Sequence, residues 1–308
     1  MLPFRSKFAI ALLLLILSLP ACQSNTSTLA PTPDFKPVIP ATPTLVILTE
    51  IVASQTPSAT SSPTAAQNTS RDFSSLASEL IEGVDWFVLI QDAHNGEILF
   101  ARNPDTPFHP ASMIKIPTAM AVLSIMEDQG RTLEDLKTTG INDRNFDALL
   151  EAMVVHSEES AAEALEYFAR GDNQLRKKLN AWGLTNTKYN PRTSTPTELI
   201  TSLRLLNTGT ALNQENTQYL LSLMGTYTEN DQILLGKLIN HLPDCAFLNK
   251  RGTMLAPTVV SDMGILTCGE QSWYLVLAGT PSINSTASFE DIQASIEAFA
   301  DAFANLVK

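Results

Sequence analysis

The chain has 308 residues, of which 44% are hydrophobic, so it is long enough for one or two domains and can bury a core. It carries 20 basic and 32 acidic residues, which gives a formal net charge of −12. Nucleic-acid binding depends on basic stripes, so this balance argues against a nucleic-acid partner, and the acidic surplus indicates little beyond a soluble surface.

Residues 1–22 have the pattern of an export signal. A basic start is followed by the apolar run 8–19, which is too short for a comfortable membrane span. Residues 19–22, with the sequence Leu-Pro-Ala-Cys, resemble the lipobox of bacterial lipoproteins, in which the cysteine is lipidated and becomes the new N-terminus. Pro20 is unusual there, so ordinary signal cleavage and an uncleaved anchor remain alternatives. All three place the rest of the chain outside the cytoplasm, and we expect an exported protein that a lipid on Cys22 anchors to the cell membrane.

Residues 23–70 consist mainly of Thr, Ser, Pro and Ala, with almost no charge. Such a segment cannot bury enough apolar surface to offset the entropy of ordering, so its composition predicts a disordered tether. As a random coil the tether would span on the order of 40 Å. The folded domain is therefore expected over 71–308.

The first elements of this domain follow from hydrophobic periodicity. Residues 74–82 have helical spacing, and the apolar runs 86–90 and 98–100 predict two strands. Asn95-Gly96 between them is a strong signal for a hairpin turn.

The remaining elements define the fold class. A mostly helical region is predicted over 113–242. Three strands are predicted after it, at 245–250, 259–267 and 273–279. The last helix would begin with a capping box formed by Ser288 and Asp291. This order predicts an α/β (α+β) domain: 71–112 and 243–308 build one antiparallel sheet flanked by helices, with an all-helical subdomain inserted.

The first chemical motif is Ser112 followed three residues later by Lys115, at the start of an apolar helix. This spacing puts the two side chains one turn apart, so that the lysine amine can take the proton of the serine hydroxyl without a histidine. Alone the pattern is weak, because about one match is expected by chance in 300 residues. A serine at a helix start is also a common cap.

Two further motifs follow in order. Ser157-Glu158-Glu159 falls between two helical stretches, and Lys250-Arg251-Gly252-Thr253 ends an apolar strand. With all three motifs present, the chain resembles the penicillin-recognising serine hydrolases, the family of class A β-lactamases and serine D-Ala-D-Ala peptidases. The resemblance extends from about residue 86 to the last helix.

The resemblance implies a set of catalytic roles. Ser112 would attack a carbonyl and form an acyl-enzyme, with Lys115 as its general base. Ser157 would relay a proton to the departing nitrogen, and Lys250 would add positive potential near Ser157 and the substrate carboxylate. The backbone N–H groups of Ser112 and Thr253 would form the oxyanion hole.

The sequence departs from the family pattern in the second and third motifs. Glu159 stands where the family has an asparagine, and a carboxylate there would raise the pKa of Lys115 and oppose its use as a base, unless Glu159 itself takes the proton. Arg251 replaces a small hydroxyl residue and would bind a substrate carboxylate bidentately, with Thr253 supplying the hydroxyl. Gly252 would let the strand approach a ligand closely.

A third departure concerns deacylation. Class A β-lactamases use a glutamate on a loop between the second and third motifs, whereas residues 186–196 contain no acid. Glu198 follows on a helix that resembles one packed away from the site. The leading hypothesis is a class A β-lactamase-type hydrolase that opens a β-lactam through Ser112. The missing glutamate favours a D-Ala-D-Ala carboxypeptidase or another serine amidase or esterase acting on cell-wall peptides. A non-catalytic ligand-binding pseudoenzyme is the third reading.

Apart from Cys22, the chain has two cysteines, Cys245 and Cys268, on strands predicted to follow one another. In an exported protein they can form a disulfide or remain as two buried thiols. The four histidines show no ligand spacing, so we expect no metal and no cofactor. The expected partners are a small-molecule β-lactam or cell-wall peptide and, through the lipid, a membrane. We expect a monomer.

Overall fold

The computed structural model describes residues 71–226 and 232–308. The predicted signal over 1–22, the lipidation site Cys22 and the tether over 23–70 lie outside the described residues. None of the helices within the described ranges is long and apolar enough to cross a membrane.

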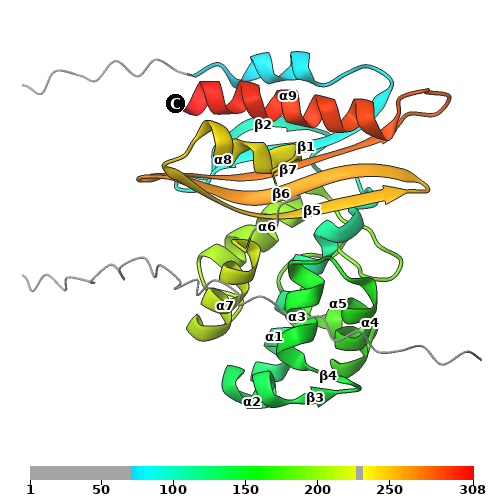
Figure 1. Ribbon diagram of the computed structural model, residues 1–308, viewed down its shortest axis with the longest axis vertical. Helices are drawn as coiled ribbons and strands as arrows, with labels where there is room; N and C mark the ends of the chain where they lie inside the picture. The colour runs from blue at the N-terminus through cyan, green and yellow to red at the C-terminus, as the bar shows by residue number, and fades with distance from the viewer. Residues whose placement is uncertain (1–70, 227–231) are drawn as a thin grey trace, which may run out of the picture. The chain divides into compact units, whose positions relative to one another are not determined.

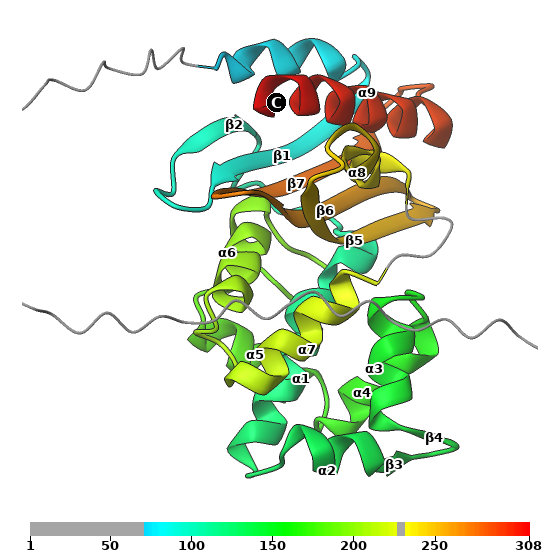
Figure 2. The same ribbon diagram turned by 60° about the vertical axis from the view of Figure 1, so that its left-hand side comes forward.

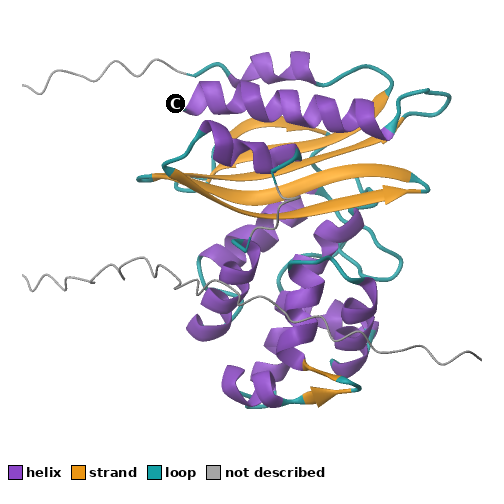
Figure 3. Cartoon of the chain, in the orientation of Figure 1, coloured by secondary structure: helices purple, strands orange, loops and turns teal. Residues whose placement is uncertain are grey.

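A five-stranded antiparallel sheet combines the two ends of the described chain (Figures 1 and 3). Its strands are β1 (Val84–Asp92), β2 (Ile98–Arg102), β5 (Cys245–Leu255), β6 (Thr258–Cys268) and β7 (Gln271–Pro281). The order β2-β1-β7-β6-β5 pairs the first strand with the last and leaves β5 at one edge. This sheet and its flanking helices confirm the predicted fold class.

Strand β5 is longer than its apolar run suggested. The expected strand ends at residue 250, but pairing with β6 continues from Lys250 opposite Met263 to Leu255 opposite Thr258. Backbone hydrogen bonds carry a ladder through polar residues that a hydrophobic pattern cannot count. The third motif therefore lies inside an edge strand and not at its end.

One face of the sheet is covered by helices from both chain ends and by a short helical pair before β5 (Figure 1). These elements are η1 (Phe73–Glu79), η3 (Leu234–Lys237), α8 (Leu238–His241) and α9 (Phe289–Val307). The predicted helix over 74–82 is a shorter 3-10 helix. The predicted capping box is confirmed, because Asp291 N donates to Ser288 Oγ at 3.1 Å and Ser288 N donates to Asp291 Oδ2 at 2.9 Å. Phe299 and Phe303 of α9 anchor the core of this layer.

The opposite face carries the inserted helical region (Figure 2). Its elements are η2 (Ala111–Ile114), α1 (Lys115–Asp128), α2 (Leu133–Thr138), α3 (Phe146–Val154), α4 (Glu159–Phe168), α5 (Asp172–Ala181), α6 (Pro196–Asn207) and α7 (Gln214–Met224). The region is not entirely helical, because β3 (Gly140–Ile141) and β4 (Arg144–Asn145) form a small hairpin. Helix α1 is buried on all sides from its first residue to Met126, which makes it the central helix of this core.

Cys245 and Cys268 are directly opposite each other on β5 and β6 and form a disulfide. Their Cα atoms are 4.3 Å apart. Of the two alternatives left open by the sequence, the structure shows the cross-link. The two cysteines are 23 positions apart in the sequence. Closing a loop of this length restricts the unfolded chain and contributes about 3 kcal/mol to the free energy of unfolding.

Candidate active site

The predicted nucleophile lies where the chain enters the central helix. Ser112 is in the 3-10 turn η2, which runs directly into α1, and Lys115 is the first residue of α1. Lys115 Nζ donates to Ser112 Oγ at 3.3 Å. Ser112 does not act as a helix cap: Pro110 holds the cap position of η2, and neither η2 nor α1 has a side-chain cap. The serine hydroxyl is therefore directed to the lysine.

The backbone before Ser112 is held in a left-handed conformation. Ala111 has φ +48°, which costs a non-glycine residue roughly 1 kcal/mol or more. His109 Nδ1 accepts a hydrogen bond from the Ala111 N–H at 3.1 Å. Burial and the nearby Arg192 guanidinium lower the pKa of His109, which favours the neutral imidazole, the form that has an acceptor nitrogen. This contact fixes the turn that presents Ser112.

Ser157 connects the two lysines of the site. It lies between α3 and α4 with φ +60°, and this turn allows its carbonyl and its hydroxyl to meet different partners. Lys115 Nζ donates to Ser157 O at 2.5 Å, and Lys250 Nζ donates to Ser157 Oγ at 2.9 Å. The structure thus brings the side chains of Ser112, Lys115, Ser157 and Lys250 into one connected group.

Edge strand β5 passes close to the nucleophile at Gly252. A Cβ on Gly252 would lie 2.8 Å from the backbone nitrogen of Ser112 and 2.9 Å from the carbonyl oxygen of Pro110. Ser261 Oγ, on β6, donates to Gly252 O at 2.7 Å. Glycine permits this approach of β5 to the backbone beside Ser112. The predicted close approach of Gly252 to a ligand stays a prediction.

Glu159, which we also expect to contact substrate, lies between the expected base and the 186–196 loop. Its Oε2 lies 3.2 Å from Lys115 Nζ, and its Oε1 accepts from the Tyr189 hydroxyl at 3.1 Å. Arg192 forms an ion pair with the same Oε1. Tyr189 and Arg192 belong to the loop over 186–196, the segment that contains no acid. The signal in the sequence for this ion pair was the opposite charge of Arg192 in the loop and Glu159 in the second motif.

The buried environment of Lys115 favours the neutral form of its amine more than the solvent around an exposed lysine would. Its side chain is 1% exposed. Burial, with a further contribution from Arg192, lowers the pKa of Lys115 to about 8, against an opposing effect of Glu158. The Glu159 carboxylate acts in the same direction as Glu158, because it stabilises the ammonium. A lysine with a pKa near neutrality suits a general base.

Glu198 is bound by the first residues of the 186–196 loop. It is 8% exposed, and its carboxylate accepts from the Asn186 backbone N–H at 2.9 Å, the Asn186 side chain at 2.8 Å and Thr187 Oγ1 at 2.6 Å. Its own N–H donates to Thr195 Oγ1, the cap of α6. All of these bonds tie Glu198 to the loop and to the start of its own helix.

Arg251 and Thr253 lie on the same strand as Lys250. Alternation along β5 places both on the strand face opposite Lys250, where Asp262 is the cross-strand partner of Arg251. Asp262 is fully buried and accepts from Asn249 Nδ2 at 3.1 Å. Burial raises the pKa of Asp262 to about 7, against the opposing effects of Asn249, Arg251 and Lys250. The pairing of Arg251 with a substrate carboxylate stays a prediction.

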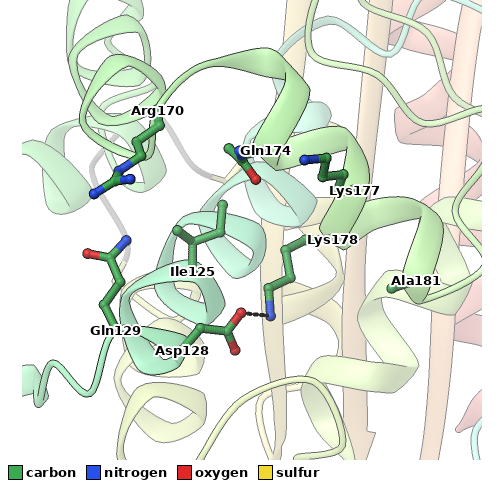
Figure 4. A pocket seen from close by; sticks show the side chains of 8 residues that line it. All are labelled: Ile125, Asp128, Gln129, Arg170, Gln174, Lys177, Lys178 and Ala181. Atoms are coloured by element: carbon green, nitrogen blue, oxygen red, sulfur yellow. Dashed lines mark ion pairs between the residues drawn. The ribbon is translucent and has the colours of Figure 1, made fainter.

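The described part of the chain also has hollows away from this cluster. One, of about 490 Å³, lies between the far end of α1 and α5 (Figure 4). It is lined by Ile125, Asp128, Gln129, Arg170, Gln174, Lys177, Lys178 and Ala181. Lys178 pairs with Asp128 there at 2.6 Å, roughly 20 Å along the helix from Lys115. A smaller apolar hollow of about 140 Å³ includes His109 and Phe108. Within 71–226 and 232–308, no group of three or more His, Cys, Asp or Glu side chains is placed to hold a metal ion.

The chain agrees with the β-lactamase fold in its sheet built from both ends of the described chain and its inserted helical region, with the serine-lysine pair where the two meet. The family model described as the beta-lactamase enzyme family matches residues 70–302, and the chain belongs to this family. A search of curated proteins gave no significant match.

Solved structures show the same fold at low sequence identity. A β-lactamase from Xanthomonas campestris is 22% identical with a TM-score of 0.64, covering 76% of this chain and 98% of its own. A β-lactamase from Sphaerobacter thermophilus is 19% identical with a TM-score of 0.62, covering 78% and 98%. A variant of PBP-A, solved as an acyl-enzyme complex with penicillin G, is 19% identical with a TM-score of 0.59, covering 76% and 97%.

Proposed function

We propose that this protein is a serine hydrolase that opens a β-lactam ring, or a related amide, through an acyl-enzyme on Ser112. The observation that carries the proposal is the 3.3 Å contact between Lys115 Nζ and Ser112 Oγ, with the lysine buried. A buried amine of lowered pKa beside a hydroxyl is the arrangement that activates a serine without histidine. Membership of the beta-lactamase enzyme family supports a hydrolase.

The contacts support a sequence of proton transfers. Neutral Lys115 takes the hydroxyl proton while Ser112 Oγ bonds to the carbonyl carbon, and the backbone N–H groups of Ser112 and Thr253 stabilise the oxyanion. The C–N bond then breaks, and the leaving nitrogen takes a proton from Ser157 Oγ. The Lys250 ammonium donates to Ser157 Oγ and replaces the proton that Ser157 gives to the leaving nitrogen. Water finally hydrolyses the ester. When water attacks the ester, Lys250 recovers a proton from that water, and Ser112 Oγ leaves with the proton held by Lys115.

The second candidate is an amidase or carboxypeptidase that acts on cell-wall peptides, and it would hold a penicillin as a stable adduct. The observation that favours it is the engagement of Glu198 by the loop, together with the absence of any acid over 186–196. Without a carboxylate to activate water, the acyl-enzyme would be hydrolysed slowly.

Fluorescent penicillin distinguishes these functions. The purified full chain is mixed with the reagent, and intact mass is followed over time. A transient adduct with turnover supports the lactamase, a persistent adduct supports the peptidase-like enzyme, and no adduct supports a binding protein. Ser112→Ala should remove labelling completely, while Ser124→Ala, on the same helix, should retain it. Labelling that survives in Ser112→Ala would disprove the assignment of the nucleophile.

We further propose that this chemistry takes place outside the cytoplasm, on a protein anchored by a lipid at Cys22. The support is the basic and apolar start of the sequence and its lipobox-like residues 19–22. Expression with radiolabelled palmitate in a bacterial host should label the protein and place it in the membrane fraction. Cys22→Ala should lose the label, and equal labelling of that variant would refute the anchor.

A further inference from the structure

Each acid of the second motif is bound by an arginine from another part of the chain. Arg144, in the small hairpin, binds Glu158 through two hydrogen bonds of 2.8 and 3.0 Å. Arg192, in the 186–196 loop, binds Glu159. Only Glu159 also contacts Lys115. The two ion pairs are therefore similar in kind, but one of them controls a carboxylate that contacts the expected base.

The two oxygens of Glu159 are divided between its partners. Oε2 faces Lys115 Nζ at 3.2 Å, while Oε1 is taken by Arg192 and by the Tyr189 hydroxyl. The Arg192 guanidinium also lies over the Tyr189 ring, 5.2 Å from its centre. The two donors to Oε1 thus hold the Glu159 carboxylate in place, and the Arg192 guanidinium compensates its negative charge.

The loop that carries Arg192 is held at several points. Lys188 and Thr193 exchange backbone hydrogen bonds of 2.9 and 3.2 Å, which closes the loop at Arg192. Phe108 and Ser194 exchange bonds of 2.9 and 3.1 Å, which ties the loop to the segment before Ser112. Arg192 is therefore presented by a rigid turn, and its position does not depend on the ion pair alone.

We propose that Arg192 is a positioning residue, which binds Glu159 so that this carboxylate does not hold Lys115 permanently as an ammonium ion, and Lys115 can serve as the base for Ser112. This inference rests on the proposed function. Arg192 is always charged. Protonated Lys115, Glu159 and Arg192 together carry a net charge of +1, whereas without Arg192 the pair of Lys115 and Glu159 would be neutral overall and would retain its proton.

The other charged and titratable groups near Lys115 do not take over the role of Arg192 in binding the Glu159 carboxylate. Glu158 is occupied by Arg144, and Lys250 reaches Ser157 from β5. His109 and Tyr189 lie beside Arg192. The lowering of the Lys115 pKa by burial and by Arg192 agrees with the arrangement of the contacts.

The test measures acylation by fluorescent penicillin from pH 6 to pH 10. The neutral amine is the active form, so the rate rises with pH through the pKa of Lys115. In Arg192→Gln the midpoint should move up by about one unit, so that acylation slows about tenfold at pH 7 and recovers at high pH. Arg192→Lys should keep the wild-type midpoint. Glu159→Gln should move the midpoint down, and so should Glu159→Asn.

A purely structural role for Arg192 gives a different result. The rate of Arg192→Gln would then fall equally at every pH, and the double variant with Glu159→Gln would not restore it; either finding overturns the proposal. Arg144→Gln removes the matched ion pair on Glu158 and should shift the midpoint much less than Arg192→Gln. An equal shift would also overturn the proposal.

A direct titration separates this inference from the proposed function. The Cε resonance of Lys115, in protein labelled with carbon-13 lysine and assigned through Lys115→Met, reports protonation without turnover. It should titrate at higher pH in Arg192→Gln and at lower pH in Glu159→Gln, even if no penicillin reacts. An unchanged titration in both variants would refute the role of Arg192, whatever the activity of the protein.

Discussion

Replacing Lys115 with methionine should slow acylation of Ser112 by about 10²- to 10⁴-fold, the range that a positioned general base contributes. Lys115 Nζ is the basic group that contacts Ser112 Oγ, at 3.3 Å. Methionine has a similar length and suits an apolar site, so the packing of α1 should survive. Glu159 would still be bound by Arg192 and Tyr189 and would not be left as an unpaired charge.

The measurement is the second-order rate of labelling by fluorescent penicillin, with thermal unfolding to establish that the variant is folded. Lys178→Met provides the matched control. Lys178 is paired with Asp128 at the far end of α1, and its loss should leave the rate unchanged. A Lys115→Met protein that acylates at the wild-type rate would exclude the lysine as the base.

Replacing Gly252 with alanine should reduce acylation by about 10²-fold or more, the cost of losing one oxyanion-hole donor. The added Cβ would meet Ser112 N at 2.8 Å and Pro110 O at 2.9 Å. Both are backbone atoms and cannot rotate away, so β5 has to move off η2. That movement would displace the backbone N–H of Thr253 from its expected place and cost about 1–3 kcal/mol of stability.

Gly140→Ala is the control for this experiment, because a Cβ at Gly140 meets nothing within 4 Å. Labelling rates and urea unfolding of the two variants are compared with those of the wild type. If Gly252→Ala acylates normally, the close passage of β5 past Ser112 has no part in catalysis.

Much of the architecture could be predicted from local patterns. The hairpin between β1 and β2 follows from Asn95-Gly96 between two apolar runs, and the start of α9 follows from the Ser288–Asp291 capping box. These features depend on residues a few positions apart, whose preferences the sequence displays directly. The extent of β5 was underestimated, because it depends on pairing with β6.

Some features of the candidate site also follow from local sequence patterns, whereas others depend on contacts between remote segments. The spacing of Ser112 and Lys115 within one helical turn is a local property, and the structure places the two side chains in contact. Glu159 was predicted to oppose a neutral Lys115, and the structure places its Oε2 3.2 Å from Lys115 Nζ. Its restraint by Arg192 was missed, because these two residues are 33 positions apart and meet only through the course of a loop.

The amino-acid sequence by itself determined the sheet built from both chain ends, the inserted helical region and the three ordered motifs, because these follow from hydrophobic period, turn chemistry and short spacings. The tertiary structure alone decided which charges meet. It put Arg251 and Lys250 on opposite faces of β5, engaged Glu198 with the loop, and brought Arg192 to Glu159. Electrostatic partners are set by distances of a few ångströms between remote segments, and only the packed fold fixes those distances.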